Sequence, residues 1–121
     1  MRSRREYVDY LRDILDAAEK AERFTRGMDF AAFARDDKTV FAVIRALEVI
    51  GEAAKKVPKS VRDRHPDTPW KRMAGIRDKL IHEYFGVNLE VVWKAVKEDL
   101  PTLRPAISRI LVELKERGGR P

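Results

Sequence analysis

The residues best suited to chemistry in this sequence are an arginine and a histidine five positions apart, Arg77 and His82. Histidine accepts or donates a proton near neutral pH, and arginine holds a phosphate and stabilises negative charge developing on it. These two groups could break RNA without a metal ion if the 2′-hydroxyl of the RNA is the nucleophile. The spacing therefore raises the hypothesis of an RNA-cleaving pair, for which no metal or cofactor is expected.

The helical geometry of this segment supports the hypothesis but leaves an alternative open. At about 100° per residue, Arg77, Asp78, His82 and Tyr84 share one half of a helix surface. Asp78 lies one turn before His82 and could orient its imidazole and favour the protonated form. A histidine near a helix end also commonly interacts with the helix dipole, and Arg77 could form surface ion pairs. In-line cleavage benefits from a base and an acid, and a symmetric dimer would supply a second histidine.

Positive charge is concentrated just before and within this segment. The net charge of the chain is +6, and residues 55–79 contain nine cations and three anions, so the remainder is balanced. Such a segment favours a polyanionic partner contacted at one place, although a solvated basic loop would look the same. The residues that we predict to contact RNA here are Lys71, Arg72 and Lys79.

Composition excludes several classes of site. The 121 residues contain no cysteine and only two histidines, His65 and His82, so disulfides, thiolate zinc sites and an all-histidine metal cage are excluded. No apolar run approaches the roughly 20 residues that span a bilayer, and no apolar segment follows the charged N-terminus. We therefore expect a cytoplasmic protein with no membrane contact. The length predicts a single helical domain over residues 1–117, followed by a disordered tail at 118–121.

Apolar residues recur at helical spacing nearly throughout, which predicts an all-α antiparallel bundle of four to five helices with a short extra turn. Gly27 is expected to end the first helix, and Asp29, Asp36 or Asp37, Ser60 and Asn88 to cap later ones. Pro101 and Pro105 fall inside the last apolar pattern, so the last helix should kink or break near Pro101. The expected helical ranges are about 5–25, 29–33, 37–57, 70–83 and 89–114.

Several conspicuous residues are better explained by structure than by chemistry. Trp70 and Trp93 are expected in the core or a dimer contact rather than as platforms for base stacking. His65, before a proline in a charged loop, is expected to be structural or exposed. Gly51 lies in mid-helix, where it costs stability relative to alanine, which indicates close helix packing there.

The segment 77–84 and the sequence around it resemble the HepT-type ribonucleases of the HEPN domain family. The matching signature is Arg77-Asp-Lys-Leu-Ile-His82-Glu-Tyr84, an arginine, four residues, a histidine, one residue and a tyrosine. The segment 42–54, then His65-Pro66, Pro69-Trp70, Ala74-Gly75, residues 84–93 and Asp99-Leu-Pro101 follow in the family's order. The resemblance spans about residues 7–114.

The resemblance implies a HEPN-like bundle that dimerises with its signature segments facing each other. It implies a metal-independent endoribonuclease that leaves a 2′,3′-cyclic phosphate, with Arg77 and His82 catalytic and Asp78 supporting them. It also implies the toxin of a type VII toxin–antitoxin module, assembling with an MntA-type nucleotidyltransferase, in which the antitoxin silences the toxin by transferring AMP to Tyr84. The alternative is a non-catalytic HEPN scaffold that binds RNA, a nucleotide or the transferase.

Overall fold

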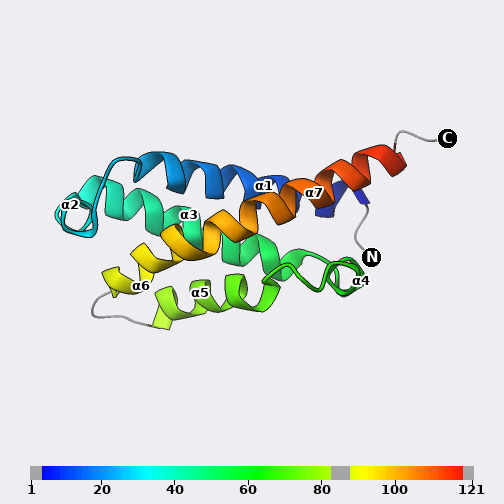
Figure 1. The fold of residues 1–121 in the computed structure, drawn as a ribbon. Coiled ribbons are helices and arrows are strands. Elements are labelled where there is room, and N and C mark those ends of the chain that lie inside the picture. The colour runs from blue at the N-terminus through cyan, green and yellow to red at the C-terminus, as the bar shows by residue number, and fades with distance from the viewer. Residues whose placement is uncertain (1–3, 83–87, 119–121) are drawn as a thin grey trace.

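The computed structural model describes residues 4–82 and 88–118, without the side chains of residues 4–6, 79, 81–82 and 116–118. In this part of the chain every regular element is helical (Figure 1), which confirms the predicted all-α class. The elements are α1 (Arg4–Phe24), α2 (Phe30–Ala34), α3 (Asp37–Lys56), α4 (Lys59–Arg64), α5 (Trp70–His82), α6 (Leu89–Lys94), the π-helical segment η1 (Ala95–Asp99) and α7 (Leu100–Gly118).

The long helices run alternately up and down, as the short connections predict. Figure 1 shows α3 between α1 and α5, with α6, η1 and α7 forming a rod that crosses the bundle. The strongest packing joins α1 to α3, α3 to α5, and α1 to α7. The short helices α2 and α4 close opposite ends of the bundle. Helix α5, which carries the signature segment, is therefore held mainly by α3.

The core lies where the apolar stripes of the long helices meet. The apolar stripe of α3 is buried from Val43 to Ala54, and Val57, directly after the helix, is buried as well. Side chains from α1 and α7 complete the core, and the fully buried ones include Leu11, Ile14, Leu47, Ile50, Leu103 and Ile107. Burial of these aliphatic side chains is the main favourable contribution to folding.

Local signals fixed most helix ends. Gly27 adopts a positive φ of 80° three residues after α1 ends. The side chain of Asp36 accepts a hydrogen bond from the Thr39 backbone N–H, which lowers the pKa of the Asp36 carboxyl below its ordinary value. Asn88 accepts from the N–H groups of Glu90 and Val91. Asp29 caps α2 in the same way.

The expected cap at Ser60 is wrong. Helix α4 begins at Lys59, and Pro58 occupies the capping position without a side-chain hydrogen bond. The carbonyl oxygen of Pro58 accepts from the N–H groups of Val61 and Arg62, at 3.0 and 3.1 Å. Pro58 has the non-helical conformation typical of a cap residue, with φ −59° and ψ 146°, so the helix begins directly after it and before the serine.

The last helical segment changes its hydrogen-bonding pattern directly before Pro101, but it does not break. The N–H of Leu100 donates to the Ala95 carbonyl, five residues back, so the chain forms a π turn directly before Pro101. Pro101 has no N–H for an α-helical bond, and its ring crowds the preceding turn. The wider π turn accommodates this, and α7 continues through Pro105. The expected kink or break is thus a change of helix type.

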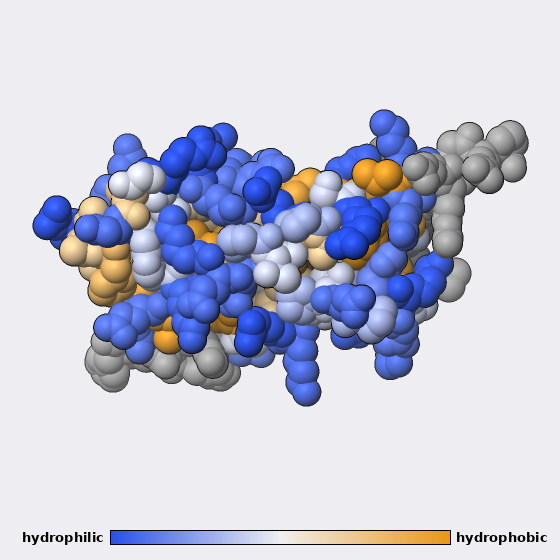
Figure 2. Space-filling model, in the orientation of Figure 1, coloured by the Kyte–Doolittle hydropathy of each residue, from blue (hydrophilic) through white to orange (hydrophobic). Residues whose placement is uncertain are grey.

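One face of the molecule is largely polar (Figure 2). The face shown in Figure 2 is hydrophilic over most of its area, with apolar atoms in separate patches. Among residues 4–82 and 88–118, no helical stretch combines the length and apolar character that crossing a bilayer requires.

Candidate functional site

Helix α5 brings the predicted catalytic residues onto one element. Arg77, Asp78 and His82 all belong to it, and His82 is its last residue. The side chains of Lys79 and His82, and Tyr84 as a whole, lie outside the described residues. The predicted contact between Asp78 and His82 therefore stays a prediction, as do the roles of Lys79 and Tyr84.

Arg77 is positioned by an unusually close approach of α5 to α3. A Cβ atom added at Gly51 would overlap the Cβ of Arg77 and lie 3.0 Å from the Met73 carbonyl oxygen. Only glycine permits this separation, because the neighbouring atoms belong to the backbone of α5 or directly adjoin it. The close packing predicted at Gly51 is thus confirmed, and its partner is the signature arginine.

The guanidinium of Arg77 is only loosely paired. Its nearest ion-pair partner among the described residues is Asp78, at 3.9 Å between Nη1 and Oδ1. The same carboxylate oxygen lies 2.5 Å from Nζ of Lys55, on the last turn of α3. Because Lys55 takes the shorter contact, the donors of Arg77 remain accessible, and its side chain is 30% exposed. An arginine in this state can bind a phosphate oxygen.

The predicted RNA contacts Lys71 and Arg72 lie on the first turn of α5. Arg72 donates to Asp99 at 3.0 Å, which ties α5 to η1. Lys71 is exposed, and no described carboxylate pairs with it. Both residues line a hollow of about 850 Å³ between α5 and the α6–η1 segment. Lys71 is therefore the freer of the two cations for a ligand.

Two partners of the site were missed from the sequence. In the sequence, Lys55 is only one of nine cations of the basic segment, yet its Nζ donates to Asp78, 23 positions away. Asp99 belongs only to the family pattern, yet its carboxylate accepts from Arg72, 27 positions away. The sequence carries no local signal for either pair, because each depends on how two helices pack.

The residues expected to be structural are so. The Nε1 of Trp70 donates to the His65 carbonyl at 3.0 Å, and Trp70 is 8% exposed. Trp93 packs on Phe33 with ring centroids 5.1 Å apart. Nε2 of His65 lies 3.7 Å from a carboxylate oxygen of Glu113 on α7, a contact that is ionic only when the imidazole is protonated.

The described residues offer no obvious metal site. Among them, no group of three or more histidine, aspartate, glutamate or cysteine side chains is arranged to hold an ion. The arrangement on α5 is instead a guanidinium, a carboxylate bridged to a lysine, and a helix end carrying a histidine. Its groups suit proton transfer and phosphate binding.

Comparison with known proteins gives one consistent result. A family model described as "Ribonuclease HepT-like" matches residues 14–110. "Probable ribonuclease HepT" of Thermococcus cleftensis is 52% identical over 107 residues, covering 88% of this chain and 97% of that protein. "Putative RNase MJ0125" of Methanocaldococcus jannaschii is 42% identical over 114 residues, covering 94% of this chain and 98% of that protein. No solved structure matches significantly.

Proposed function

The chain belongs to the HepT-like ribonuclease family, and from this premise we propose that it is an endoribonuclease that cleaves RNA without a metal ion. Arg77 and His82 are its catalytic residues, and Asp78 is a positioning residue. The observation that carries the proposal is the state of Arg77. Its backbone is fixed against Gly51, while its guanidinium keeps only a long ion pair to Asp78 among the described residues.

The reaction requires proton transfers at two oxygens. A base removes the proton from the 2′-hydroxyl, whose oxygen attacks the adjacent phosphorus and forms a 2′,3′-cyclic phosphate. The bond from phosphorus to the 5′-oxygen breaks, and an acid returns a proton to that oxygen. Arg77 binds the non-bridging oxygens, where negative charge increases in the transition state. His82 is the residue of the signature able to carry these protons near neutral pH.

One chain supplies one such histidine, so the proposal includes a homodimer. Two copies facing each other along α5 would place two imidazoles at one groove, one as base and one as acid.

The first test is cleavage of RNA in the presence of EDTA by the wild type and by Arg77→Ala and His82→Ala. We expect each substitution to reduce the rate at least about 100-fold, the usual contribution of a general acid or base or of a charge-stabilising donor. His65→Ala and Arg109→Ala are the matched controls. They change the same residue types outside α5 and should keep near wild-type rates.

Full activity of either α5 variant would reject its catalytic role. Tight RNA binding by an unmodified wild type that never cleaves would instead support a non-catalytic HEPN scaffold.

We further propose that the chain is the toxin of a type VII toxin–antitoxin module, controlled by a nucleotidyltransferase of the MntA type. The phenol oxygen of Tyr84 would attack the α-phosphorus of ATP, release pyrophosphate and lose its proton. The adduct would place a bulky anion two residues after His82. It would then block the groove and repel the phosphates of the RNA.

Modification is tested by the intact mass of the chain after incubation with such a transferase and ATP. We expect the addition of one adenylyl group and a loss of RNA cleavage. Tyr84→Phe should gain no mass and stay active, because phenylalanine has no nucleophilic oxygen. An adduct on Tyr84→Phe would show that another residue is the acceptor.

A further inference from the structure

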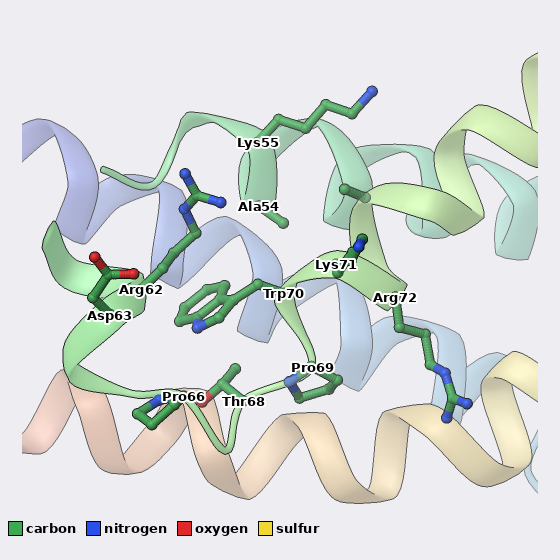
Figure 3. Close-up of a pocket in the computed structure, with 11 residues that line it drawn as sticks. Ala54, Lys55, Arg62, Asp63, Pro66, Thr68, Pro69, Trp70, Lys71 and Arg72 are labelled. Carbon is green, nitrogen blue, oxygen red and sulfur yellow. The ribbon is translucent and has the colours of Figure 1, made fainter. Parts of the chain in front are cut away.

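A second cation-rich site lies beside the signature, at the junction of α3, α4 and α5. Figure 3 shows this cavity, which has a volume of about 1000 Å³. We call it the junction pocket. It is lined by the end of α3 with Lys55, by Arg62 and Asp63 of α4, by the loop before α5, and by the first turn of α5 with Lys71 and Arg72.

Arg62 is the unusual group of the junction pocket. Its Nε is buried and has no hydrogen-bond partner, and its guanidinium makes no ion pair with any described residue. Figure 3 shows the side chain running past Trp70 toward the end of α3. Buried donors are nearly always paired, because leaving one unpaired forfeits its hydration. An acceptor brought by a ligand would pair this one.

The charges around the pocket do not cancel. Asp63 is paired to Lys59 at 2.8 Å, Lys55 to Asp78, and Arg72 to Asp99. Arg62 and Lys71 therefore keep charges that no described carboxylate compensates. The N-terminal end of α5, at the same place, adds partial positive charge. The pocket thus suits an anion with several acceptor oxygens, such as a phosphate.

The pocket does not suit a nucleobase. Trp70 is its aromatic residue, but only 8% of Trp70 is exposed and its Nε1 already donates to the His65 carbonyl. The ring therefore offers no free face for stacking. A nucleic acid would be bound here through its backbone rather than through its bases.

The pocket lies in line with the catalytic residues. Ala74 lines it, and Asp78 follows one turn later on α5. At 1.5 Å per residue, Lys71 precedes His82 by about 16 Å along the helix axis. At about 3.4 Å of rise per nucleotide, an RNA strand covers this distance with roughly five nucleotides or fewer. A strand lying along α5 would therefore reach both sites.

We propose that the junction pocket binds a backbone phosphate of the RNA strand, a few nucleotides from the scissile phosphate, with Arg62 as the principal donor. This inference rests on the proposed ribonuclease function and adds a binding subsite to it. The subsite would increase affinity and orient the strand along α5 without selecting bases.

The test measures binding of a single-stranded 12-nucleotide RNA with 2′-O-methyl riboses, which cannot undergo the proposed cleavage. Arg62→Met keeps an unbranched apolar side chain out to the position of Nε and removes the guanidinium with its unpaired buried N–H. The fold should therefore tolerate this change. We expect the Kd to rise about tenfold, as for loss of one charged hydrogen bond. The slope of log K against log salt should become shallower by about 0.7, the value for one phosphate contact on a single strand.

Arg109→Met is the matched control, because it removes the same charge from an exposed position on α7 that does not line the pocket. Thermal unfolding of both variants verifies that they fold.

If Arg62→Met bound the RNA with the same affinity and salt slope as Arg109→Met, the proposal would be overturned. It would equally be overturned if inorganic phosphate bound to the wild type and not to Arg62→Met while RNA bound both alike. Because the probe cannot be cleaved, this test stands apart from the nuclease test. A wild type that binds as expected but cuts no RNA would contradict the ribonuclease function alone.

Discussion

Among the individual residues of the site, Lys55 has the least obvious role. It lies on α3, yet its Nζ contacts Oδ1 of Asp78, the same oxygen that lies 3.9 Å from Nη1 of Arg77. Both members of this pair are more than 40% exposed, so it contributes only about 0–1 kcal/mol to stability. Its importance is therefore expected in the chemistry of the site rather than in folding.

Replacing Lys55 should reveal this role. In Lys55→Met, we expect Asp78 to pair more closely with Arg77 and weaken the hold of the guanidinium on phosphate. RNA cleavage should fall about 3- to 10-fold, the effect of roughly 1 kcal/mol of lost interaction with a charged group, with little change in the unfolding temperature. Lys55→Arg should recover most of the activity.

The neighbouring lysine gives the matched control for this prediction. Lys56 pairs with Glu52, at 3.7 Å, on its own helix. Lys56→Met removes the same charge without touching Asp78, so its cleavage rate should stay near that of the wild type. Equal losses of cleavage rate in the two variants would mean that Lys55 acts only through its positive charge and not through its contact with Asp78.

At the scale of helices, the contact between α3 and α5 decides where Arg77 lies. Gly51→Ala would gain about 1 kcal/mol of helix propensity. It would also place a methyl group onto Arg77 and within 3.0 Å of the Met73 carbonyl oxygen. Because the obstructing atoms are not the ends of flexible side chains, α5 must shift. We expect a net destabilisation of about 1–3 kcal/mol, typical of overpacking.

The same substitution should also lower RNA cleavage, because the shift moves Arg77. Gly75→Ala on α5 is the control for folding, since its added methyl group meets nothing within 4 Å. It should leave the free energy of unfolding unchanged or raise it by up to about 1 kcal/mol. Chemical denaturation of both variants measures the difference, and equal stabilities would contradict the close approach.

The helices themselves were largely predictable from the sequence, for local reasons. Asp36, Asn88 and Gly27 act on groups within three residues of themselves, so their types identify the helix ends. The cap predicted at Ser60 was wrong because α4 begins directly after Pro58, two residues earlier. The position of the disturbance near Pro101 was predictable, but the π turn was not, because it also depends on packing against the bundle.

The surroundings of the site were much less predictable. The α5 residues Arg77, Asp78 and His82 could be placed on one helix from their spacing alone. The ion pairs made by Lys55 and Arg72 could not, since they join residues 23 and 27 positions apart. The burial of the Arg62 Nε, whose side chain runs past Trp70 (Figure 3), likewise depends on how distant parts of the chain pack.

At the scale of the whole molecule, the proposed dimer should make the activity depend on protein concentration. If base and acid come from two subunits, the activity per chain should fall when the protein is diluted below the concentration at which it dimerises. Sedimentation of the same samples should show a species of twice the 14.0 kDa chain mass losing population in parallel. Constant activity per chain in a fully monomeric sample would contradict the shared site.

The most direct test of the central claim is the chemistry of the cut ends that the wild type produces in EDTA. Attack by the 2′-hydroxyl, with Arg77 and His82 as the reacting groups, predicts 2′,3′-cyclic phosphate and 5′-hydroxyl ends. These ends should be absent when His82 is replaced by alanine. Fragments ending in 3′-hydroxyl and 5′-phosphate, or unchanged cyclic-phosphate formation by His82→Ala, would contradict the account.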